Sequence, residues 1–371
     1  MSNFSATDCR YMARALQLAR NALTTAHPNP RVGCVLVRDD VIVGEGWHRK
    51  SGEAHAEVNA IEAAGSATAG ATAYVTLEPC SHTGKTGPCT QALIRARIAR
   101  VIFAIEDPSP RAAGRAGEIL ASAGIEVRSG LMRAEAFALN EGFLMRIGRQ
   151  RPFVRLKVAA SLDGRTAMRN GQSRWITGEA ARADVQMLRA MSGAILTGVG
   201  TVLADDPLLT VREPVLALRP PLRGIVDSTL RTPTAAKMLG QPGETVIFCV
   251  DDRHRESLEK AGAVVRRVAS KNGRVDLSEV LRELADREAN DVLVEAGPGL
   301  SGSLMVAGLV DELVIYQAPH IMGSETLGMF ATAEWTELEH RKHFHVVDIR
   351  RVGQDQRIVM RPVASSKASG H

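Results

Sequence analysis

The amino-acid sequence predicts an α/β protein built from two domains. Segments rich in Val and Ile alternate along the chain with segments whose apolar residues recur at helical spacing. The chain has 371 residues, which is long for one core when a domain averages ~150 residues. A polar, helix-terminating stretch at residues 148–152 separates two such series. We therefore expect one domain over residues 1–148, a second over 149–363 and a disordered tail over 364–371.

The first domain is expected to begin with a helix. Ser5 and Asp8 have the spacing of a capping box, and apolar residues then recur at helical spacing to about Thr25. Two strands should follow at 32–37 and 41–47, joined at Asp39-Asp40. After them we expect alternating elements: helix 55–64, strand 72–76, helix 90–96, strand 101–105, helix 114–123, strand 125–129 and helix 134–146. This alternation predicts a sheet sandwiched between helices.

The second domain is expected to repeat the α/β pattern. Its predicted elements are a helix at 179–189 and strands at 153–159, 194–197, 224–227, 246–250, 264–268, 292–295, 313–318, 343–350 and 357–361. The glycine-rich run from Gly297 to Ser303 follows the strand at 292–295 and leads into a helix. Free backbone N–H groups at such a point can receive phosphate, although glycines there can also serve packing alone. No G-x-G-x-x-G follows the first strand, so a Rossmann fingerprint is absent.

Composition narrows the possible functions. No apolar run approaches the ~20 residues of a membrane span, and the first ten residues lack the order of a signal peptide. The net charge is +5, but only 4% of the residues are aromatic and the basic residues are dispersed, so we expect no nucleic-acid partner. An odd count of five cysteines favours a reducing, cytoplasmic compartment. We expect Cys9, Cys34 and Cys249 to be buried thiols.

The stretch most informative for chemistry combines His55-Ala56-Glu57 with Cys80 and Cys89. One histidine and two cysteines suit Zn²⁺, and three protein ligands leave a coordination position for water. Zinc lowers the pKa of bound water towards ~7, and a carboxylate that is not a ligand can carry protons. We therefore predict one Zn²⁺ per chain, held by His55, Cys80 and Cys89, with Glu57 as the catalytic proton carrier.

A closed structural zinc site is the alternative. In that arrangement His82 becomes a fourth ligand, and the metal only holds a long loop together. Glu57 would then have no catalytic role. In addition, the side chains of residues two apart on a helix point ~200° apart, so Glu57 need not lie on the same face as His55. The sequence leaves open whether the fold brings Glu57 over the metal.

The spacing of the cysteines points to a particular family. H-x-E followed by P-C-x-x-C marks zinc deaminases, but here eight residues separate Cys80 from Cys89. With this spacing, Pro79-Cys80-Ser81-His82-Thr83-Gly84-Lys85-Thr86-Gly87-Pro88-Cys89 resembles the bifunctional deaminase/reductase of riboflavin biosynthesis. The resemblance implies a cytidine-deaminase-like three-layer αβα domain that hydrolytically deaminates 2,5-diamino-6-(5-phosphoribosylamino)pyrimidin-4-one. It also implies that substrate is contacted by Asn29, His48, His82, Lys85 and Asp107.

The second half resembles the reductase domain of the same family. The resemblance is carried by Lys157 to Arg165, Ser173 to Thr177 and Thr201 to Pro207. It implies a dihydrofolate-reductase-like α/β fold in which NADPH reduces the ribosyl group of 5-amino-6-(5-phosphoribosylamino)uracil to ribityl. The implied cofactor residues are Ala159, Trp175, Thr201, Asp205, Ser228, Gly297, Pro298, Gly299, Leu300, Ser301, Gly302 and Ser303. The implied substrate residues are Ser173, Arg189, Leu209, Arg212 and Glu295.

The resemblance covers about Ser5 to Pro362 and further implies a homo-oligomer joined through the reductase half. Two rival interpretations remain. One is a zinc deaminase of another nucleobase or nucleoside, fused to an unrelated reductase. The other is a non-catalytic protein that binds zinc and a nucleotide, which predicts four protein ligands at the metal and no NADPH oxidation.

Overall fold

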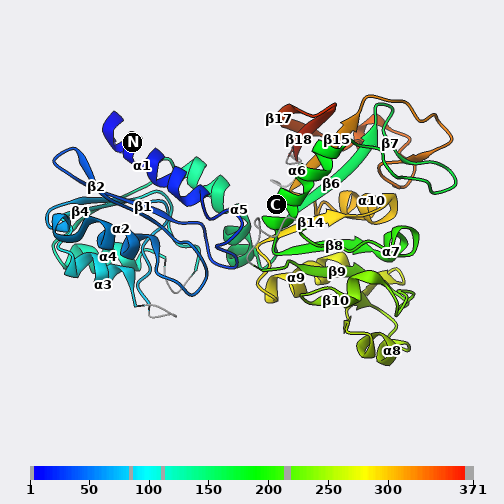
Figure 1. Cartoon of the computed structure of the whole chain (residues 1–371), viewed down its shortest axis with the longest axis horizontal. Coiled ribbons are helices and arrows are strands. Elements are labelled where there is room, and N and C mark those ends of the chain that lie inside the picture. The colour runs from blue at the N-terminus through cyan, green and yellow to red at the C-terminus, as the bar shows by residue number, and fades with distance from the viewer. Residues whose placement is uncertain (1–3, 83–86, 110–112, 213–218, 364–371) are drawn as a thin grey trace. The chain divides into compact units, whose positions relative to one another are not determined.

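A computed structural model describes residues 4–82, 87–109, 113–212 and 219–363. The chain forms two compact units, Met1–Gln150 and Arg151–His371 (Figure 1). Each unit has its own sheet and its own buried core. Among the described helices, none is both long and apolar enough to span a membrane. The predicted tail at 364–371 lies outside the described residues.

The N-terminal unit contains one five-stranded sheet in the order β2-β1-β3-β4-β5. Strands β1 and β2 form an antiparallel hairpin, β1 also pairs antiparallel with β3, and β3, β4 and β5 run parallel. The strands are β1 (Gly33–Arg38), β2 (Val41–Trp47), β3 (Thr72–Val75), β4 (Arg100–Phe103) and β5 (Glu126–Ser129). The helices are α1 (Ala6–Arg20), α2 (Ala56–Ala64), α3 (Cys89–Arg95), α4 (Arg115–Ser122) and α5 (Arg133–Arg149).

Helices cover both faces of this sheet, as the alternation of elements predicts. Helices α1 and α5 lie on one face, and α2, α3 and α4 lie on the other (Figure 1). Small residues allow the close approach: a Cβ added at Gly33 would lie 2.0 Å from the Ala15 carbonyl oxygen of α1. On the opposite face, a Cβ at Gly46 would lie 2.4 Å from the Ala56 carbonyl oxygen of α2. The unit therefore has three layers, helix–sheet–helix.

The C-terminal unit contains a nine-stranded sheet in the order β11-β10-β9-β8-β14-β6-β15-β18-β17. Its strands are β6 (Phe153–Ser161), β8 (Ala194–Gly198), β9 (Leu222–Val226), β10 (Thr245–Cys249), β11 (Val264–Arg267), β14 (Asp291–Glu295), β15 (Glu312–Ala318), β17 (Phe344–Val352) and β18 (Asp355–Pro362). Two small sheets pair β12 (Ser270–Lys271) with β13 (Arg274–Val275), and β7 (Arg165–Ala167) with β16 (Leu327–Gly328). The helices are α6 (Glu179–Ala190), α7 (Val199–Asp205), α8 (Arg255–Lys260), α9 (Leu277–Asp286) and α10 (Pro298–Val306).

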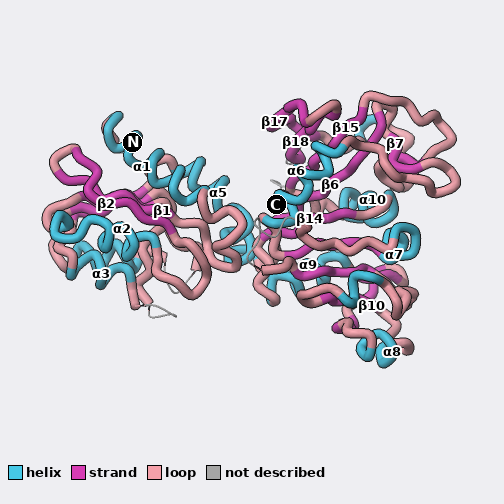
Figure 2. Tube along the Cα trace, in the orientation of Figure 1, coloured by secondary structure: helices cyan, strands magenta, loops and turns pink. Residues whose placement is uncertain are grey.

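The pattern of burial shows why the strands of this unit are apolar on both faces. In β14, Val292 and Val294 pack in the core that α9 and α10 cover, whereas Leu293 packs against α6. Seven neighbouring strands run parallel to one another: β11, β10, β9, β8, β14, β6 and β15. Strands β18 and β17 then add antiparallel strands at one edge. Figure 2 shows the strands lying between the helices. Parallel strands covered on both faces are a general feature of α/β sheets.

Several expectations need correction. Helix α1 ends at Arg20 rather than near Thr25, because residues 21–25 continue as turns. Cys9 is exposed on α1, not buried, although Cys34 and Cys249 are buried as expected. The prediction missed α7, α8, α9 and the short strands β7, β12, β13 and β16. Helix α9 had a detectable signal, since Asp276 caps it and its buried residues recur at helical spacing; the two- and three-residue strands had none.

Candidate functional sites

Three predicted metal ligands meet in the N-terminal unit. His55 Nδ1 lies 3.2 Å from Cys89 Sγ and 3.4 Å from Cys80 Sγ, and the three potential ligand atoms all lie within 4.8 Å of one another. His55 is the N-cap of α2, Cys80 lies in the loop after β3, and Cys89 opens α3. Helices α2 and α3 and the loop after β3 thus bring together three residues that are spread over 35 positions of the sequence, from His55 to Cys89.

The donor set fits zinc. The Cys89 thiol hydrogen-bonds to Cys80 and thereby lowers the pKa of Cys80 to about 4, while the same contact and burial raise the pKa of Cys89. The Cys89 backbone N–H also donates to Cys80 Sγ at 3.3 Å. Metal binding displaces such thiol protons. Within the described part of the chain, His82 does not join the cluster, so the ligand set is the three-residue one of an open site.

Glu57 is buried next to this cluster. His55 has an extended backbone, with φ −75° and ψ 165°, so the ~200° divergence of helical residues two apart does not apply to the pair. The Glu57 side chain is 3% exposed, and burial together with the Cys80 thiolate raises the pKa of Glu57 to about 7. A carboxyl group with a pKa near neutral can both accept and donate a proton at pH 7.

His48 connects the predicted substrate residue Asn29 to the metal cluster. The Asn29 Nδ2 atom lies 3.0 Å from His48 Nε2, and the His48 ring stands edge-on to the His55 ring at 5.3 Å between centroids. On its other side His48 Nδ1 lies 3.2 Å from the Ala54 carbonyl oxygen. Burial lowers the pKa of His48. The two ends of the β1–β2 hairpin are therefore brought together beside the cluster.

Glu78 is a residue to which the sequence assigned no role. It is buried, and its carboxylate accepts hydrogen bonds from the backbone N–H groups of Asp107, Gly114 and Ala116, each at 3.1 Å. These contacts tie the loop that carries Asp107 to the segment that carries Cys80. The available signal was a charged residue directly after the buried strand β3 and Thr76-Leu77.

Three further residues of this unit, Asp107, His82 and Lys85, were predicted to contact the substrate. Asp107 is half-buried, burial raises its pKa, and its carboxylate accepts from the Ser109 backbone N–H at 2.8 Å. His82 is exposed and close enough to Asp107 to oppose that rise electrostatically. Lys85 lies outside the described residues.

The C-terminal unit contains a cavity of about 1670 Å³. It opens at the carboxyl ends of β6, β14, β8 and β9, where ligands of parallel α/β sheets generally bind. All but one of the residues of this unit that were predicted to hold cofactor or substrate line it: Ala159, Ser173, Trp175, Arg189, Thr201, Asp205, Leu209, Arg212, Ser228, Glu295, Gly297, Pro298, Gly299, Leu300, Gly302 and Ser303. The exception is Ser301, which is fully buried and donates to the Ala296 carbonyl oxygen.

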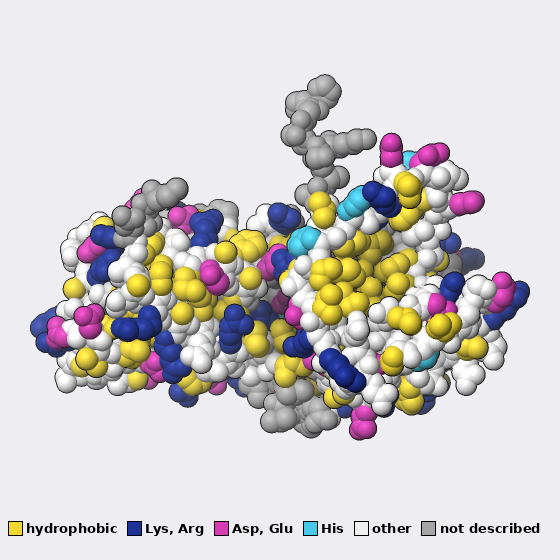
Figure 3. All heavy atoms as spheres, turned by 90° about the horizontal axis from the view of Figure 1, so that it is seen from above, with side chains coloured by type: hydrophobic (Ala, Val, Ile, Leu, Met, Phe, Trp, Pro, Cys, Tyr) yellow, Lys and Arg dark blue, Asp and Glu magenta, His cyan; other side chains and the backbone are white. Residues whose placement is uncertain are grey.

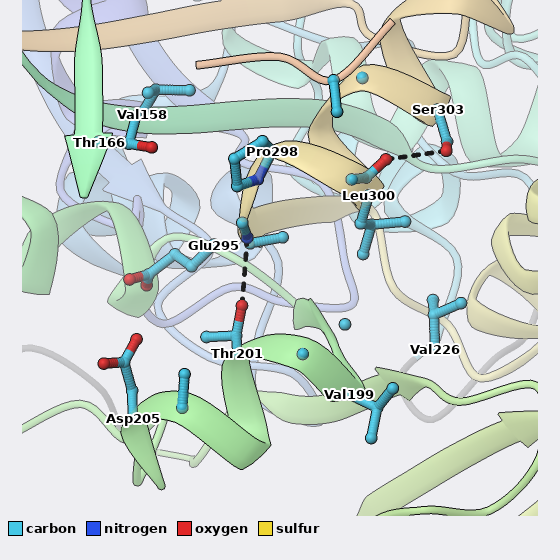
Figure 4. A pocket seen from close by; sticks show the side chains of 18 of the residues that line it. Val158, Thr166, Val199, Thr201, Asp205, Val226, Glu295, Pro298, Leu300 and Ser303 are labelled. Atoms are coloured by element: carbon cyan, nitrogen blue, oxygen red, sulfur yellow. Dashed lines mark hydrogen bonds between the residues drawn. The ribbon is translucent and has the colours of Figure 1, made fainter. Parts of the chain in front are cut away.

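Two carboxylates, those of Glu295 and Asp205, line this cavity. Figure 4 shows Glu295 and Asp205 on one side of Thr201, with Val199, Val226 and Leu300 on the other. The Glu295 carboxylate accepts two hydrogen bonds from Arg189, at 2.6 and 3.0 Å. Burial alone would raise the pKa of Glu295, but Arg189 and Lys157 lower it overall. Lys157 itself lines the cavity and is a charged group there that sequence reasoning left without a role.

The glycine-rich segment lines the cavity and also packs against the rest of the unit. Thr201 Oγ1 accepts from the Gly297 backbone N–H at 3.1 Å, where α10 begins (Figure 4). Gly302 packs against the backbone of Ala331, because an added Cβ would lie 2.2 Å from the Ala331 carbonyl oxygen. Ser303 Oγ donates to the Gly299 carbonyl oxygen at 2.8 Å within the helix. The segment is therefore the first turns of a helix, with its positive end at the cavity.

Trp175 and Ser173 also line the cavity. Trp175 is 66% exposed, and the Arg182 guanidinium lies 4.5 Å from its ring centroid. Ser173 Oγ lies 3.5 Å from an oxygen of Asp205, and the Arg174 guanidinium donates to the Asp205 backbone carbonyl. A large exposed aromatic surface on a cavity wall can stack against a planar ring.

Comparisons with known proteins match both units. A family model for the cytidine and deoxycytidylate deaminase zinc-binding region matches residues 5–105, and one for the RibD C-terminal domain matches residues 152–356. The riboflavin biosynthesis protein RibD of Escherichia coli is 48% identical over 93% of this chain and 96% of its own length. The protein of the same name from Haemophilus influenzae is 42% identical over 98% of this chain and 99% of its own.

Solved structures agree over the same length. A crystal form of Acinetobacter baumannii RibD superimposes with a TM-score of 0.90 at 42% identity, covering 96% of this chain and 99% of that one. A diaminohydroxyphosphoribosylaminopyrimidine deaminase/5-amino-6-(5-phosphoribosylamino)uracil reductase from Thermotoga maritima has a TM-score of 0.84 at 33% identity, with the same coverage. The likeness therefore extends over both units.

Proposed function

Because this chain belongs to the bifunctional deaminase/reductase family of riboflavin biosynthesis, we propose how its two units divide that work. Family membership confirms the fold class, the two enzymatic activities and the two cofactors, Zn²⁺ and NADPH, that the sequence led us to expect. Our proposal concerns which residues perform each step. The observation that carries it is the His55, Cys80 and Cys89 cluster with buried Glu57 beside it.

Residues 1–148, within the N-terminal unit Met1–Gln150, are the proposed deaminase domain. His55, Cys80 and Cys89 would hold zinc, which when bound lowers the pKa of a water molecule so that the water can attack the amino-bearing carbon. Glu57 would accept the proton of that water and pass it to the departing ammonia, a task that its buried position beside the cluster suits. Asn29, His48, His82, Lys85 and Asp107 would hold the phosphoribosyl pyrimidine.

Residues 149–363, nearly all of them in the C-terminal unit that begins at Arg151, are the proposed reductase domain. NADPH supplies the hydride that converts the ribosyl group to ribityl. Thr201, Trp175 and the N-terminal turn of α10 would hold the cofactor, because that turn presents free N–H groups to phosphate. Arg189, Arg212 and Glu295 would hold the substrate. Arg212 can meet phosphate oxygens in bidentate fashion, whereas Arg189 donates to the Glu295 carboxylate and positions it.

We further propose that the protein is a homo-oligomer joined through the reductase unit. Strand β17 is an edge strand, and Val346, Val347 and Ile349 on it are 55%, 52% and 59% exposed. Figure 3 shows apolar side chains gathered on one face of this unit. A long, apolar edge strand is usually covered by another chain. We propose the cytoplasm as its compartment, since all five cysteines are free of disulfides.

A coupled assay tests the division of labour. Ammonia release and NADPH loss are followed together on 2,5-diamino-6-(5-phosphoribosylamino)pyrimidin-4-one, and both are expected in that order. Ammonia release from cytidine or guanine in place of this substrate would instead favour a deaminase of another base. Zinc bound by four protein ligands, with neither product formed, would favour a non-catalytic protein.

A further inference from the structure

A small two-stranded sheet lines part of the cavity in the C-terminal unit. Its strands β7 and β16 pair antiparallel and do not belong to the nine-stranded sheet. Thr166 of β7, Leu327 of β16 and Met329 just after β16 all line the cavity (Figure 4 labels Thr166). We call the two segments that carry these strands, residues 162–172 and 320–333, the β7–β16 flap.

The two segments of the flap are held to different extents. In the second segment, Met329 and Phe330 pack against the core of the unit. In the first segment, residues 162–172 are all exposed or half-buried. The ladder between the segments pairs two residues of each strand, and a two-stranded hairpin is marginally stable by itself in water. The first segment therefore needs a further attachment to stay against the cavity.

Asp163 supplies such an attachment. It lies in the turn between β6 and β7, and its carboxylate accepts hydrogen bonds from the backbone N–H groups of Met322 at 3.1 Å and Gly323 at 2.8 Å. The hydroxyl of Ser161, a fully buried residue at the end of β6, donates to the same carboxylate at 2.6 Å. One side chain thus joins the end of β6 to both segments of the flap.

The surroundings of Asp163 suit a carboxylate. Gly323 has a φ of +93°, a conformation open to glycine, and successive backbone N–H groups in a turn form a concavity that binds anions. The hydrogen bonds from Ser161, Met322 and Gly323 lower the pKa of Asp163 to about 2, so the carboxylate is ionised at neutral pH. An asparagine would offer these three donors one neutral oxygen, because its NH₂ group cannot accept.

Other contacts hold the turn and the flap without Asp163. The Leu162 backbone N–H donates to the His320 carbonyl oxygen at 2.8 Å, and Thr166 Oγ1 donates to the Gly328 carbonyl oxygen at 3.2 Å. Asp163 itself is exposed and lies outside the core. Its replacement should therefore loosen the flap without unfolding the unit.

We propose that Asp163 is a positioning residue for the reduction, because its carboxylate holds the β7–β16 flap against the ligands in the cavity. The inference rests on the proposed reductase function of this unit. Asp163 does not itself line the cavity, so it acts through flap residues such as Thr166 and Met329. If the flap is in place for only part of the time, the apparent affinity for ligand falls by that fraction, whereas saturating ligand restores the closed arrangement.

Steady-state kinetics on the full-length protein tests this proposal. NADPH loss is followed on 5-amino-6-(5-phosphoribosylamino)uracil, with each ligand varied in turn, for the unaltered protein, Asp163→Asn and Asp163→Ala. Asp286→Asn is the matched control, because Asp286 is an exposed carboxylate at the end of α9 that does not line the cavity. Hydrogen exchange of the flap is measured on the same proteins without ligand, which observes the attachment independently of catalysis.

We expect both Asp163 variants to lower kcat/KM for reduction about tenfold, as for a lost charged hydrogen bond, through a raised KM. The value of kcat should stay within twofold, since saturating ligand closes the flap. Exchange should quicken at residues 162–172 and 320–328, and saturating NADPH with substrate should restore protection. Ammonia release should be normal in both variants, and Asp286→Asn should match the unaltered protein throughout.

An unaltered KM in both Asp163 variants overturns the proposal. A fall in kcat at constant KM also overturns it, because that result marks a loss of folded enzyme rather than a loosened flap. Failure of the proposed reductase function would look different. The unaltered protein would then oxidise no NADPH on this substrate, while faster exchange of the flap in Asp163→Asn would still support the attachment through Asp163.

Discussion

Asn140 and Arg31 exchange two hydrogen bonds although 109 residues separate them. The Arg31 backbone N–H donates to Asn140 Oδ1 at 2.8 Å, and Asn140 Nδ2 donates to the Arg31 carbonyl oxygen at 2.9 Å. Asn140 is 1% exposed, and its non-helical backbone (φ −119°, ψ 17°) interrupts α5. The Asn140 side chain thus pairs with both backbone groups of Arg31, as a neighbouring strand would, and holds the segment that carries Asn29 in place.

Replacing Asn140 by Ala should therefore affect stability and substrate binding together. The substitution removes both contacts in a buried setting, and we expect it to destabilise the N-terminal unit by ~1–3 kcal/mol. Because Asn29 lies two residues before Arg31, the KM for deamination should rise more than kcat falls. Urea unfolding and steady-state ammonia release measure the two effects. Glu62→Ala, an exposed and unpartnered position on α2, should change neither.

Glu57→Gln should retain zinc yet lose deamination. The amide occupies the same volume but cannot accept a proton, so we expect a fall of ~10²–10⁴-fold in ammonia release. Metal content by atomic absorption should equal that of the unaltered protein, and reduction of separately supplied deaminated substrate should be normal. Near-normal ammonia release would remove Glu57 from the mechanism.

Cys80→Ser should lose the metal and the first activity only. A serine hydroxyl is a far weaker zinc ligand than a thiolate, because it stays protonated at neutral pH. Zinc content and ammonia release should both fall to background, and a chelator should produce the same loss in the unaltered protein. NADPH oxidation on deaminated substrate should persist in both cases, since each unit has its own core. Loss of that oxidation would show that the units depend on each other to fold.

Glu78→Gln should loosen the loop that carries Asp107. In the unaltered protein the Glu78 carboxylate accepts hydrogen bonds from three backbone N–H groups. A glutamine side chain offers these groups one neutral oxygen, and its NH₂ group cannot accept a hydrogen bond. We expect a higher KM for deamination with unchanged zinc content, and faster hydrogen exchange confined to residues near 107–116. A loss of zinc instead would mean that Glu78 supports the metal cluster rather than the loop.

The Arg189–Glu295 pair should make the stability of the C-terminal unit depend on pH. Burial opposes ionisation of Glu295, yet Arg189 and Lys157 together lower its pKa below the usual value. A carboxyl group whose pKa is lower in the folded state adds stability above its unfolded pKa of ~4.3, and this stability is lost as pH falls through the folded value. Glu295→Gln should cost about 3–5 kcal/mol at pH 7, because it leaves Arg189 buried without its charge partner.

Thermal unfolding from pH 7 down to pH 3 measures this dependence. The melting temperatures of the unaltered protein and of Glu295→Gln should differ most at pH 7 and should converge as the acid protonates Glu295. Glu339→Gln, at an exposed position in the segment before β17, is the control and should match the unaltered protein at every pH. A gap that stays constant with pH would show that the pair contributes nothing electrostatic.

Much of the fold could be predicted from local pattern. The β2 strand was predicted at its observed bounds. The other long strands and, apart from α9, the long helices were placed within a few residues, because apolar periodicity records which face of an element is buried. Short elements such as β12 and β13 escaped, because two residues carry no periodicity.

The sequence by itself determined the chemistry of this protein: a ligand set of one histidine and two cysteines, a carboxylate two residues from the histidine, and a glycine-rich strand-to-helix turn. Those features are local, and residue type fixes them. Tertiary structure alone decided that Glu57 lies beside the cysteines, that Asn140 holds the segment of Asn29, and that Ser301 faces the core instead of the cavity. Such facts depend on where the helices pack against the sheets, and that packing is set by contacts between residues far apart in the chain.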